Sequence, residues 1–178
     1  MEYIKIIISG KRGTGKTTLF WGLQKQLSWP TFSVSQFLRD YIFTHGLSNK
    51  VEDINSRSEE ITREIDNRII ELLKGDYHVI VETRVFGYIY EQFPDTLKVL
   101  LVCDDIVRIN RYAFRQGISQ EEARKRLFKK EDEWFEKMKK LYNRDDFFNN
   151  QYYDLVIDTT NLIAEQIQSL VLAKLKSL

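Results

Sequence analysis

The sequence has little cysteine, little proline and no long apolar run. Its 178 residues include one cysteine and two prolines. A single cysteine excludes an internal disulfide framework and is typical of proteins from a reducing compartment. No apolar run approaches the roughly 18 residues that a membrane span requires, and the first residues show no signal-peptide pattern. We therefore expect a cytoplasmic protein with no membrane association.

The chain also lacks an excess of charge of one sign. Lysine and arginine number 27 and aspartate and glutamate 26, which gives a formal net charge of +1. This balance gives no global attraction to nucleic acid. The two histidines have no further ligand at metal-binding spacing, so we expect no zinc site. The length and the absence of a linker-like tract predict one domain, and we expect it to act as a monomer on small molecules.

A glycine-rich loop follows an apolar run at residues 3–8 and precedes a helical pattern at residues 18–27. The loop, residues 10–17, matches GxxxxGK[ST]. In this motif backbone N–H groups surround phosphate oxygens, the lysine reaches the β- and γ-phosphates, and the hydroxyl can bind Mg²⁺. We predict that ATP and Mg²⁺ bind here, with Thr17 as the metal ligand and the following residues around the nucleotide: Gly10, Lys11, Arg12, Gly13, Thr14, Gly15, Lys16, Thr17 and Thr18.

Predicted strands and helices alternate along the rest of the chain. Further strands are expected at residues 31–34, 77–81, 97–102 and 155–157, and helices at residues 36–43, 58–74, 106–116, 119–142 and 162–178. This alternation predicts an α/β fold with three layers (αβα) around a five-stranded parallel sheet. Ligands of such sheets bind at the carboxyl edge of the strands. Polar residues follow the predicted strands and should meet there: Ser33, Ser35, Glu82, Thr83, Arg84, Asp104, Asp105, Asp158, Thr159 and Thr160.

Other parts of the chain bear on which class of phosphate-binding protein this is. Asn49-Lys50-Val51-Glu52 resembles the base-reading motif of GTPases, but it comes too early in the chain. A motor ATPase would usually be larger. A kinase for a small acceptor is favoured, because Arg39 and Arg84 stand where planar guanidinium groups could bind an acceptor phosphate.

Six segments occur in the order and approximate spacing of the cytidylate kinases, and the short archaeal-type form is the most similar: residues 10–18, 33–40, 65–68, 82–87, 108–117 and 153–160. The resemblance covers nearly the whole chain. It implies transfer of the γ-phosphoryl group of ATP to CMP or dCMP by a single P-loop kinase domain, residues 1–178. The core would comprise residues 1–34, 75–116 and 152–178, the helical acceptor-binding flap about residues 35–74 and the lid about residues 117–142.

The resemblance also implies roles for individual residues. The arginines that match Arg39 and Arg84 hold the acceptor phosphate, and the acceptor site as a whole would comprise Ser33, Arg39, Asp66, Arg68, Arg84 and Gly87. Lys130 and Lys137 stand where the family's lid presents arginines, so the catalytic set would be Lys16, Arg84, Lys130 and Lys137. Arg108, Arg111 and Arg115 lie near one another on the surface of a predicted helix, and we expect Arg111 and Arg115 to bind the cofactor.

Two departures from the family pattern leave alternatives open. Lysine supplies charge in the lid but lacks the two-pronged hydrogen bonding of arginine, and a lost contact of this kind can cost about 3 kcal/mol of transition-state stabilisation. Ser35 and Gln36 replace a glycine and an acidic residue of the flap, which bears on base selection. The acceptor could therefore be AMP, UMP or a small non-nucleotide, or the protein could be a nucleotide-binding regulatory module with weak catalysis.

Overall fold

The structure is a computed structural model that describes residues 2–45, 58–85 and 93–177. Its strands are β1 (Lys5–Gly10), β2 (Thr31–Ser33), β3 (Val79–Glu82), β4 (Thr96–Val102) and β5 (Leu155–Asp158). Its helices are α1 (Lys16–Leu27), α2 (Val34–Thr44), α3 (Glu59–Lys74), α4 (Asp105–Gln116), α5 (Gln120–Tyr142) and α6 (Ala164–Leu175), with a 3₁₀ turn at Asn150–Tyr152. Each predicted strand is present, and α1 begins two residues earlier than predicted.

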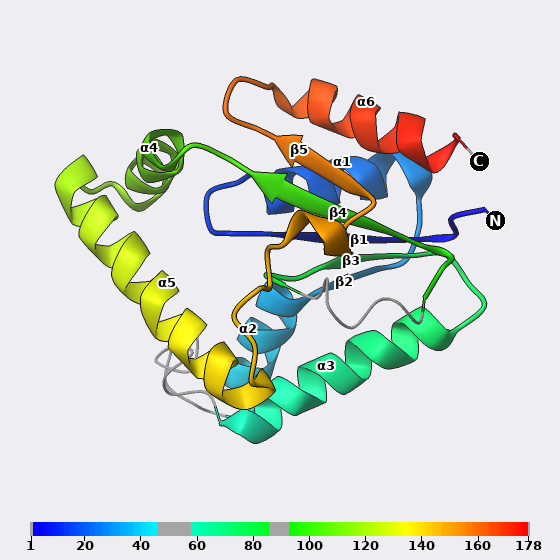
Figure 1. Cartoon of the computed structure of the whole chain (residues 1–178), viewed down its shortest axis with the longest axis horizontal. Coiled ribbons are helices and arrows are strands. Elements are labelled where there is room, and N and C mark those ends of the chain that lie inside the picture. The colour runs from blue at the N-terminus through cyan, green and yellow to red at the C-terminus, as the bar shows by residue number, and fades with distance from the viewer. Residues whose placement is uncertain (1, 46–57, 86–92, 178) are drawn as a thin grey trace.

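The five strands form one parallel sheet in the order β2-β3-β1-β4-β5 (Figure 1). β1 lies in the centre, with Ile6 paired to Ile80 of β3 and to Leu97 of β4. All six residues of β1 are buried, as expected for a parallel strand that is covered on both faces. The central position of β1 places the loop that follows it in the middle of the carboxyl edge. The predicted fold is confirmed.

Helices cover both faces of the sheet (Figure 1). Ile6 and Ile8 of β1 pack with apolar side chains of α1 and α6, whereas Ile7 between them packs with α3. Alternate residues of a strand point to opposite faces, so β1 contributes to two separate cores. Phe37 and Leu38 of α2 join the α3 side. The result is the three-layer arrangement predicted from the alternation of elements.

α4 and α5 pack against each other through a third apolar cluster, which includes Ile109 of α4 and Leu127 of α5. Gly117, with a φ of 64°, ends α4, and its N–H bonds back to the last turn of that helix. Ser119 then caps α5 by accepting a hydrogen bond from the Glu122 N–H, as its position in the sequence predicted. α5 continues for 23 residues, so the predicted lid is mainly a single long helix. None of the helices in the described ranges is both long and apolar enough to cross a membrane.

Candidate active site

The phosphate-binding loop, residues 10–17, connects β1 to α1 at the carboxyl edge of the sheet. Gly10 has a φ of 146°, and a Cβ there would lie 2.5 Å from the carbonyl oxygen of Leu101 in the neighbouring strand. Only glycine fits such a conformation and approach. The loop ends at Gly15, the residue that precedes the first turn of α1. The unpaired N–H groups and the dipole of that turn favour a bound anion.

Lys16 is the first residue of α1, and its Nζ donates a hydrogen bond of 2.9 Å to the Lys11 carbonyl across the loop. Burial lowers the pKa of the Lys16 ammonium to about 7, and the nearby guanidinium groups of Arg84 and Arg12 act in the same direction. The Glu82 carboxylate opposes them. An anion beside Lys16 would remove this penalty, because it favours the charged form.

Glu82, at the end of β3, joins the loop to the start of α2. It is 5 % exposed, and its two carboxylate oxygens accept hydrogen bonds of 2.7 Å from the hydroxyls of Thr17 and Ser33. The Ser33 hydroxyl lies 3.0 Å from that of Ser35, and Ser33 also caps α2. A buried carboxylate thus links the predicted metal ligand with the first residue of the predicted acceptor site. The sequence indicated that Glu82 lies at this edge but did not single it out.

Thr159, directly after β5, supports the loop from the other side. Its hydroxyl lies 2.9 Å from the Thr14 carbonyl and 3.1 Å from the Val102 carbonyl. Arg111 of α4 lies beside it and donates to the carbonyls of Gly13, at 3.2 Å, and Thr159, at 2.9 Å. Arg111 is therefore close to the loop, as predicted for a cofactor-binding residue, and it contacts the loop backbone directly.

Arg108 corrects a sequence-based interpretation, since we expected it on the helix surface and it is only 1 % exposed. Its guanidinium bonds to the Arg12 carbonyl at 2.7 Å and forms ion pairs with Asp105 and with Glu131 of α5. Glu131 also accepts a hydrogen bond from the Arg12 N–H, at 3.3 Å. The packing of α4 and α5 against the loop buries this charge, which the spacing of residues within one helix cannot reveal. The middle of α5 is thereby joined to the phosphate-binding loop.

The predicted acceptor residues are more dispersed. Arg39 and Arg68 are exposed on α2 and α3, and Arg68 lies 3.4 Å from Glu71. Asp66 accepts a hydrogen bond from the Tyr142 hydroxyl at the end of α5. The Arg84 guanidinium lies over the indole of Trp134, 4.9 Å from the ring centroid. Gly87 and the segment at residues 49–52 lie outside the described residues.

The predicted lid residues Lys130 and Lys137 lie on α5 and are half-buried. Arg115, predicted to bind the cofactor, is exposed near the end of α4. The Arg115 guanidinium lies 5.6 Å from the centroid of the Tyr112 ring. Lys11 of the loop lies 5.9 Å from the ring centroid of Phe148, which follows α5. The lid side of the site therefore combines lysine charge with aromatic surface.

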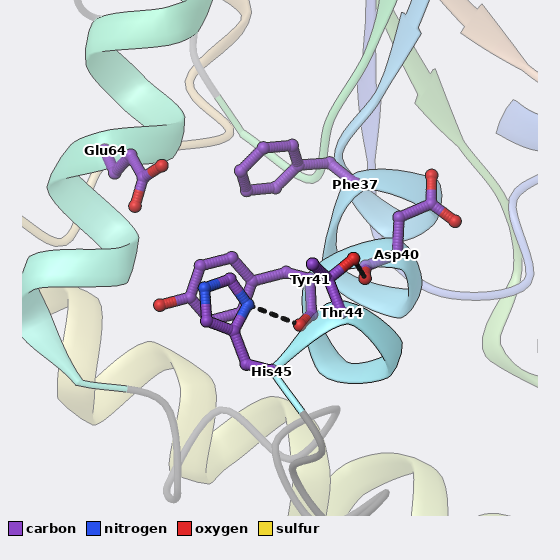
Figure 2. Close-up of a pocket in the computed structure, with 6 residues that line it drawn as sticks. All are labelled: Phe37, Asp40, Tyr41, Thr44, His45 and Glu64. Atoms are coloured by element: carbon purple, nitrogen blue, oxygen red, sulfur yellow. Dashed lines mark hydrogen bonds between the residues drawn. The ribbon is translucent and has the colours of Figure 1, made fainter.

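A cavity of about 410 Å³ lies between α2 and α3 (Figure 2). Among the residues that the structure describes, its lining contains two carboxylates and no lysine or arginine: Phe37, Asp40, Tyr41, Thr44, His45 and Glu64. The α2 residues among them recur every three or four positions and so share one face of the helix, whereas Arg39 lies on the opposite face. The described part of the lining therefore does not suit a phosphate, and Arg39, the predicted phosphate-binding arginine of α2, faces away from it.

The residues around Thr17 fit a magnesium ion chemically. Mg²⁺ prefers oxygen ligands and usually uses one or two protein groups together with substrate phosphates. The Thr17 hydroxyl and the Glu82 carboxylate, 2.7 Å apart, supply such oxygens. Within the described ranges, no group of three or more histidine, cysteine or acidic residues is arranged to hold a metal by itself. A magnesium ion at this site would therefore depend on a nucleotide for the remaining ligands.

A comparison with protein-family models decides the family of this chain. The model of the cytidylate kinase-like family matches residues 31–161. The chain belongs to the cytidylate kinase-like family. The matched residues contain β2 to β5 and the whole of α4 and α5, so membership extends well beyond the loop motif, which precedes them.

Full-length relatives agree with this assignment. The cytidylate kinase of Saccharolobus islandicus, strain L.S.2.15, is 30% identical over 176 residues, which cover 97% of this chain and 90% of the relative. The cytidylate kinase of Sulfolobus acidocaldarius is 30% identical over 172 residues, covering 95% and 92%. This member of the cytidylate kinase-like family thus shares nearly its whole length with them.

Solved structures share the fold at low sequence identity. An uncharacterised protein from Eubacterium ventriosum has a TM-score of 0.71 at 16% identity, with 98% of this chain and 99% of that chain covered. A shikimate kinase from Bacteroides thetaiotaomicron has a TM-score of 0.61 at 18% identity, with 94% and 98% covered. These similarities concern the fold of this cytidylate kinase-like protein and leave its acceptor to be argued from the site.

Proposed function

We propose that the protein transfers the γ-phosphoryl group of ATP to CMP or dCMP. The observation that carries the proposal is the buried Glu82, because Thr17 of the donor loop and Ser33 at the start of α2 both donate to it. A predicted donor residue and a predicted acceptor residue thus lie at one point of the sheet edge, which supports direct transfer between two bound nucleotides. The names of the cytidylate kinases at 30% identity support a cytidine nucleotide as the acceptor.

On the donor side, the loop from Gly10 to Thr18 would hold the phosphates of ATP, and Lys16 would neutralise the β- and γ-phosphates. Thr17 and Glu82 would hold Mg²⁺, which when bound adds positive charge beside the phosphate oxygens. Arg111 holds the loop backbone through the Gly13 carbonyl. The exposed Arg115 would reach the nucleotide from the end of α4.

On the acceptor side, Arg39 and Arg84 would bind the phosphate of the monophosphate. Guanidinium groups suit this task because they donate two parallel hydrogen bonds to oxyanions. The remaining members of the proposed site are Ser33, Asp66, Arg68 and Gly87. Residues 35–74 would act as the acceptor-binding flap of a single domain whose core comprises residues 1–34, 75–116 and 152–178.

For the transfer step, the charge on the migrating phosphoryl group would be stabilised by Lys16, by Arg84 and by Lys130 and Lys137 of the lid, residues 117–142. Phosphoryl transfer depends mainly on positioning and charge stabilisation, so a strong general base is not required. Exclusion of water matters more, since water competes as an acceptor. Because lysine lacks the fork of arginine, we expect slower turnover than an arginine-bearing lid would give.

An acceptor panel tests the proposal. Purified protein with ATP and Mg²⁺ is given CMP, dCMP, UMP, AMP and a small sugar acid, and release of ADP is measured. CMP or dCMP should give the fastest release. If another acceptor is faster by about tenfold, the acceptor assignment is wrong although the kinase assignment survives.

A second function is favoured by the lysines in the lid, namely that of a nucleotide-binding regulatory module. It predicts that ATP raises the melting temperature while no acceptor increases ADP release. Turnover of about 1 s⁻¹ or more, the lower end of typical kinase rates, would exclude it. The expectation that the protein is a cytoplasmic monomer stays a prediction.

A further inference from the structure

One face of α5 contacts three separate parts of the site. Glu131, Trp134 and Tyr142 are spaced so that they lie close to one line along the helix. Glu131 reaches the loop through Arg12 and Arg108, Trp134 lies against Arg84, and Tyr142 donates to Asp66 of α3. In Figure 1, α5 runs along the side of the molecule from α4 towards α3. The helix therefore spans the donor loop, the phosphate-binding arginine and the acceptor flap.

Trp134 is held rigidly in this position. It is 5 % exposed, and its ring contacts Phe147 edge-on, with centroids 5.9 Å apart, and Phe148 at 6.3 Å. Phe147 itself is fully buried. A tryptophan packed in this way has a fixed ring orientation, so it can serve as a platform for another group.

The Arg84 guanidinium lies on this ring face. Its carbonyl accepts a hydrogen bond of 2.9 Å from Gly10, the first residue of the loop. Burial is the main cause of the lowered pKa of Lys16, and repulsion between its ammonium and the Arg84 guanidinium acts in the same direction. The face of an indole attracts a cation within about 6 Å of its centroid, and the observed separation is 4.9 Å. The ring thus offsets part of the repulsion that would turn Arg84 away from the loop.

We propose that Trp134 is a positioning residue, which holds the Arg84 guanidinium in place to receive the acceptor phosphate. The inference rests on the proposed function, because it assumes that Arg84 binds the acceptor. It adds a residue of the lid helix to the acceptor site, whereas the sequence analysis predicted only Lys130 and Lys137 of that helix, both for the transfer step. Loss of the ring should weaken acceptor binding and leave ATP binding nearly unchanged.

Steady-state kinetics of three variants test this role. Trp134→Leu removes the ring face, and Trp134→Phe keeps a smaller one. Phe135→Leu removes an edge contact of 5.6 Å with Trp134 but leaves both members of the stack, Arg84 and Trp134, in place. We expect Trp134→Leu to raise the KM for CMP by about tenfold, Trp134→Phe to raise it less, and Phe135→Leu to leave it near the wild-type value. The KM for ATP should stay within about twofold in all three.

The proposal would be overturned if Trp134→Leu raised the KM for ATP as much as the KM for CMP, or if Phe135→Leu raised the KM for CMP equally. Either result would mean that Trp134 contributes only to packing. Melting temperatures of the three variants check that each is folded. Trp134→Phe keeps the test open if the leucine variant does not fold.

A measurement without substrate separates this inference from the proposed function. A proton above the face of an indole ring resonates upfield. The ¹H chemical shift of the Arg84 Nε–H should therefore differ from those of the other arginines in a ¹H–¹⁵N spectrum. The signal that disappears in Arg84→Lys identifies it. The displacement should vanish in Trp134→Leu and persist in Phe135→Leu. If no monophosphate is turned over by the wild type, the proposed function fails while this spectrum still judges the stack. If turnover is normal and the displacement is absent, the inference alone fails.

Discussion

The two halves of the site differ in how firmly their charged and polar groups are held. Around the donor loop, Arg108, Glu131 and Thr159 are buried and bonded to loop backbone atoms. On the acceptor side, Arg39 and Arg68 are exposed on helices of the flap. A preorganised half binds without rearrangement, whereas exposed groups must lose side-chain freedom when a ligand binds. The comparison shows that the residues around the loop are already fixed, whereas the predicted acceptor arginines are not, and it predicts that ATP binds before the acceptor.

The largest effect is expected at the centre of the rigid half. Lys16→Ala removes the ammonium that would neutralise the β- and γ-phosphates, and we expect ADP release to fall by about 10³-fold, as for other lost transition-state contacts. Lys25→Ala, an exposed lysine at the other end of α1, is the matched control. Equal rates for the two variants would mean that the loop does not act in catalysis.

The next effect concerns the stability of the rigid half. Arg108→Ala leaves the Glu131 carboxylate buried without its main partner, and breaking a buried pair in this way costs about 3–5 kcal/mol of unfolding free energy. The exposed pair of Arg126 and Glu122 on α5 is the control, because exposed pairs contribute about 1 kcal/mol or less. Urea unfolding of Arg108→Ala and Arg126→Ala measures both. Similar losses of unfolding free energy in the two variants would show that the ion pair of Arg108 and Glu131 contributes little to stability.

A change on the predicted acceptor side, where the arginines are exposed, should alter a different kinetic constant. Arg39→Ala removes a charged hydrogen-bond donor from the proposed acceptor site, and we expect the KM for CMP to rise by about 10- to 100-fold. The KM for ATP should not change, since the donor loop is held by other residues. Arg63→Ala, an exposed arginine of α3, serves as the comparison. A matching rise in the KM for ATP would contradict the division into two halves.

A smaller effect is expected in the pH dependence of ATP binding, which tests Lys16 without replacing it. Its pKa is about 7, and bound phosphate raises that value because an opposite charge favours the protonated form. Binding above pH 7 therefore takes up a proton, so the Kd for ATP should rise with pH by up to about tenfold per unit and level off below pH 7. Calorimetric titration in buffers of different ionisation enthalpy measures the number of protons that the complex takes up when ATP binds.

Lys16→Arg is the control for that experiment, because arginine stays charged throughout this range. Any pH dependence that it retains comes from the nucleotide or from other groups. A constant Kd between pH 7 and 8.5 for the natural protein would show that Lys16 is already protonated in the free site.

The smallest effect is expected where the two halves meet. Tyr142→Phe removes the hydroxyl that donates to Asp66, and a lost hydrogen bond of this kind costs about 0.5–1.5 kcal/mol of stability. Tyr77→Phe, on an exposed tyrosine, should cost less. Urea unfolding distinguishes the two, and no difference between them would mean that the contact of α5 with α3 is not stabilising.

Local features of the sequence predicted much of this molecule. The alternation of apolar strands with helical patterns predicted all five strands. Ser58 and Ser119, the first residues of two predicted helices, cap α3 and α5. The loop at residues 10–17 was predicted because its glycine conformations and the following helix are encoded within a few residues. Glu82 could also have been singled out, since an acidic residue directly follows a buried apolar strand.

Other features depend on contacts between distant residues. The hydrogen bond from Arg12 to Glu131 joins positions 119 apart in the chain, and no local pattern distinguishes Glu131 from the many charged residues of α5. Trp134 likewise gains its contact with Arg84 only when α5 packs beside the end of β3. For this reason the sequence analysis named Lys130 and Lys137, whose role in a lid stays a prediction, and missed Glu131 and Trp134, which join α5 to the loop and to Arg84.

The sequence by itself determined the parallel sheet and the glycine-rich loop, because each depends on residue types at short and regular spacing. It also indicated the family, through the order of six segments along the chain. Only the tertiary structure decided which charges are buried and which side chains support the loop. Arg108 illustrates the reason: its exposure is a property of the packing of two helices against the loop, and not of its own place in the helical repeat. The loop has the glycine conformations and the helix start that suit a phosphate, and the packing around it determines which of the neighbouring side chains are fixed.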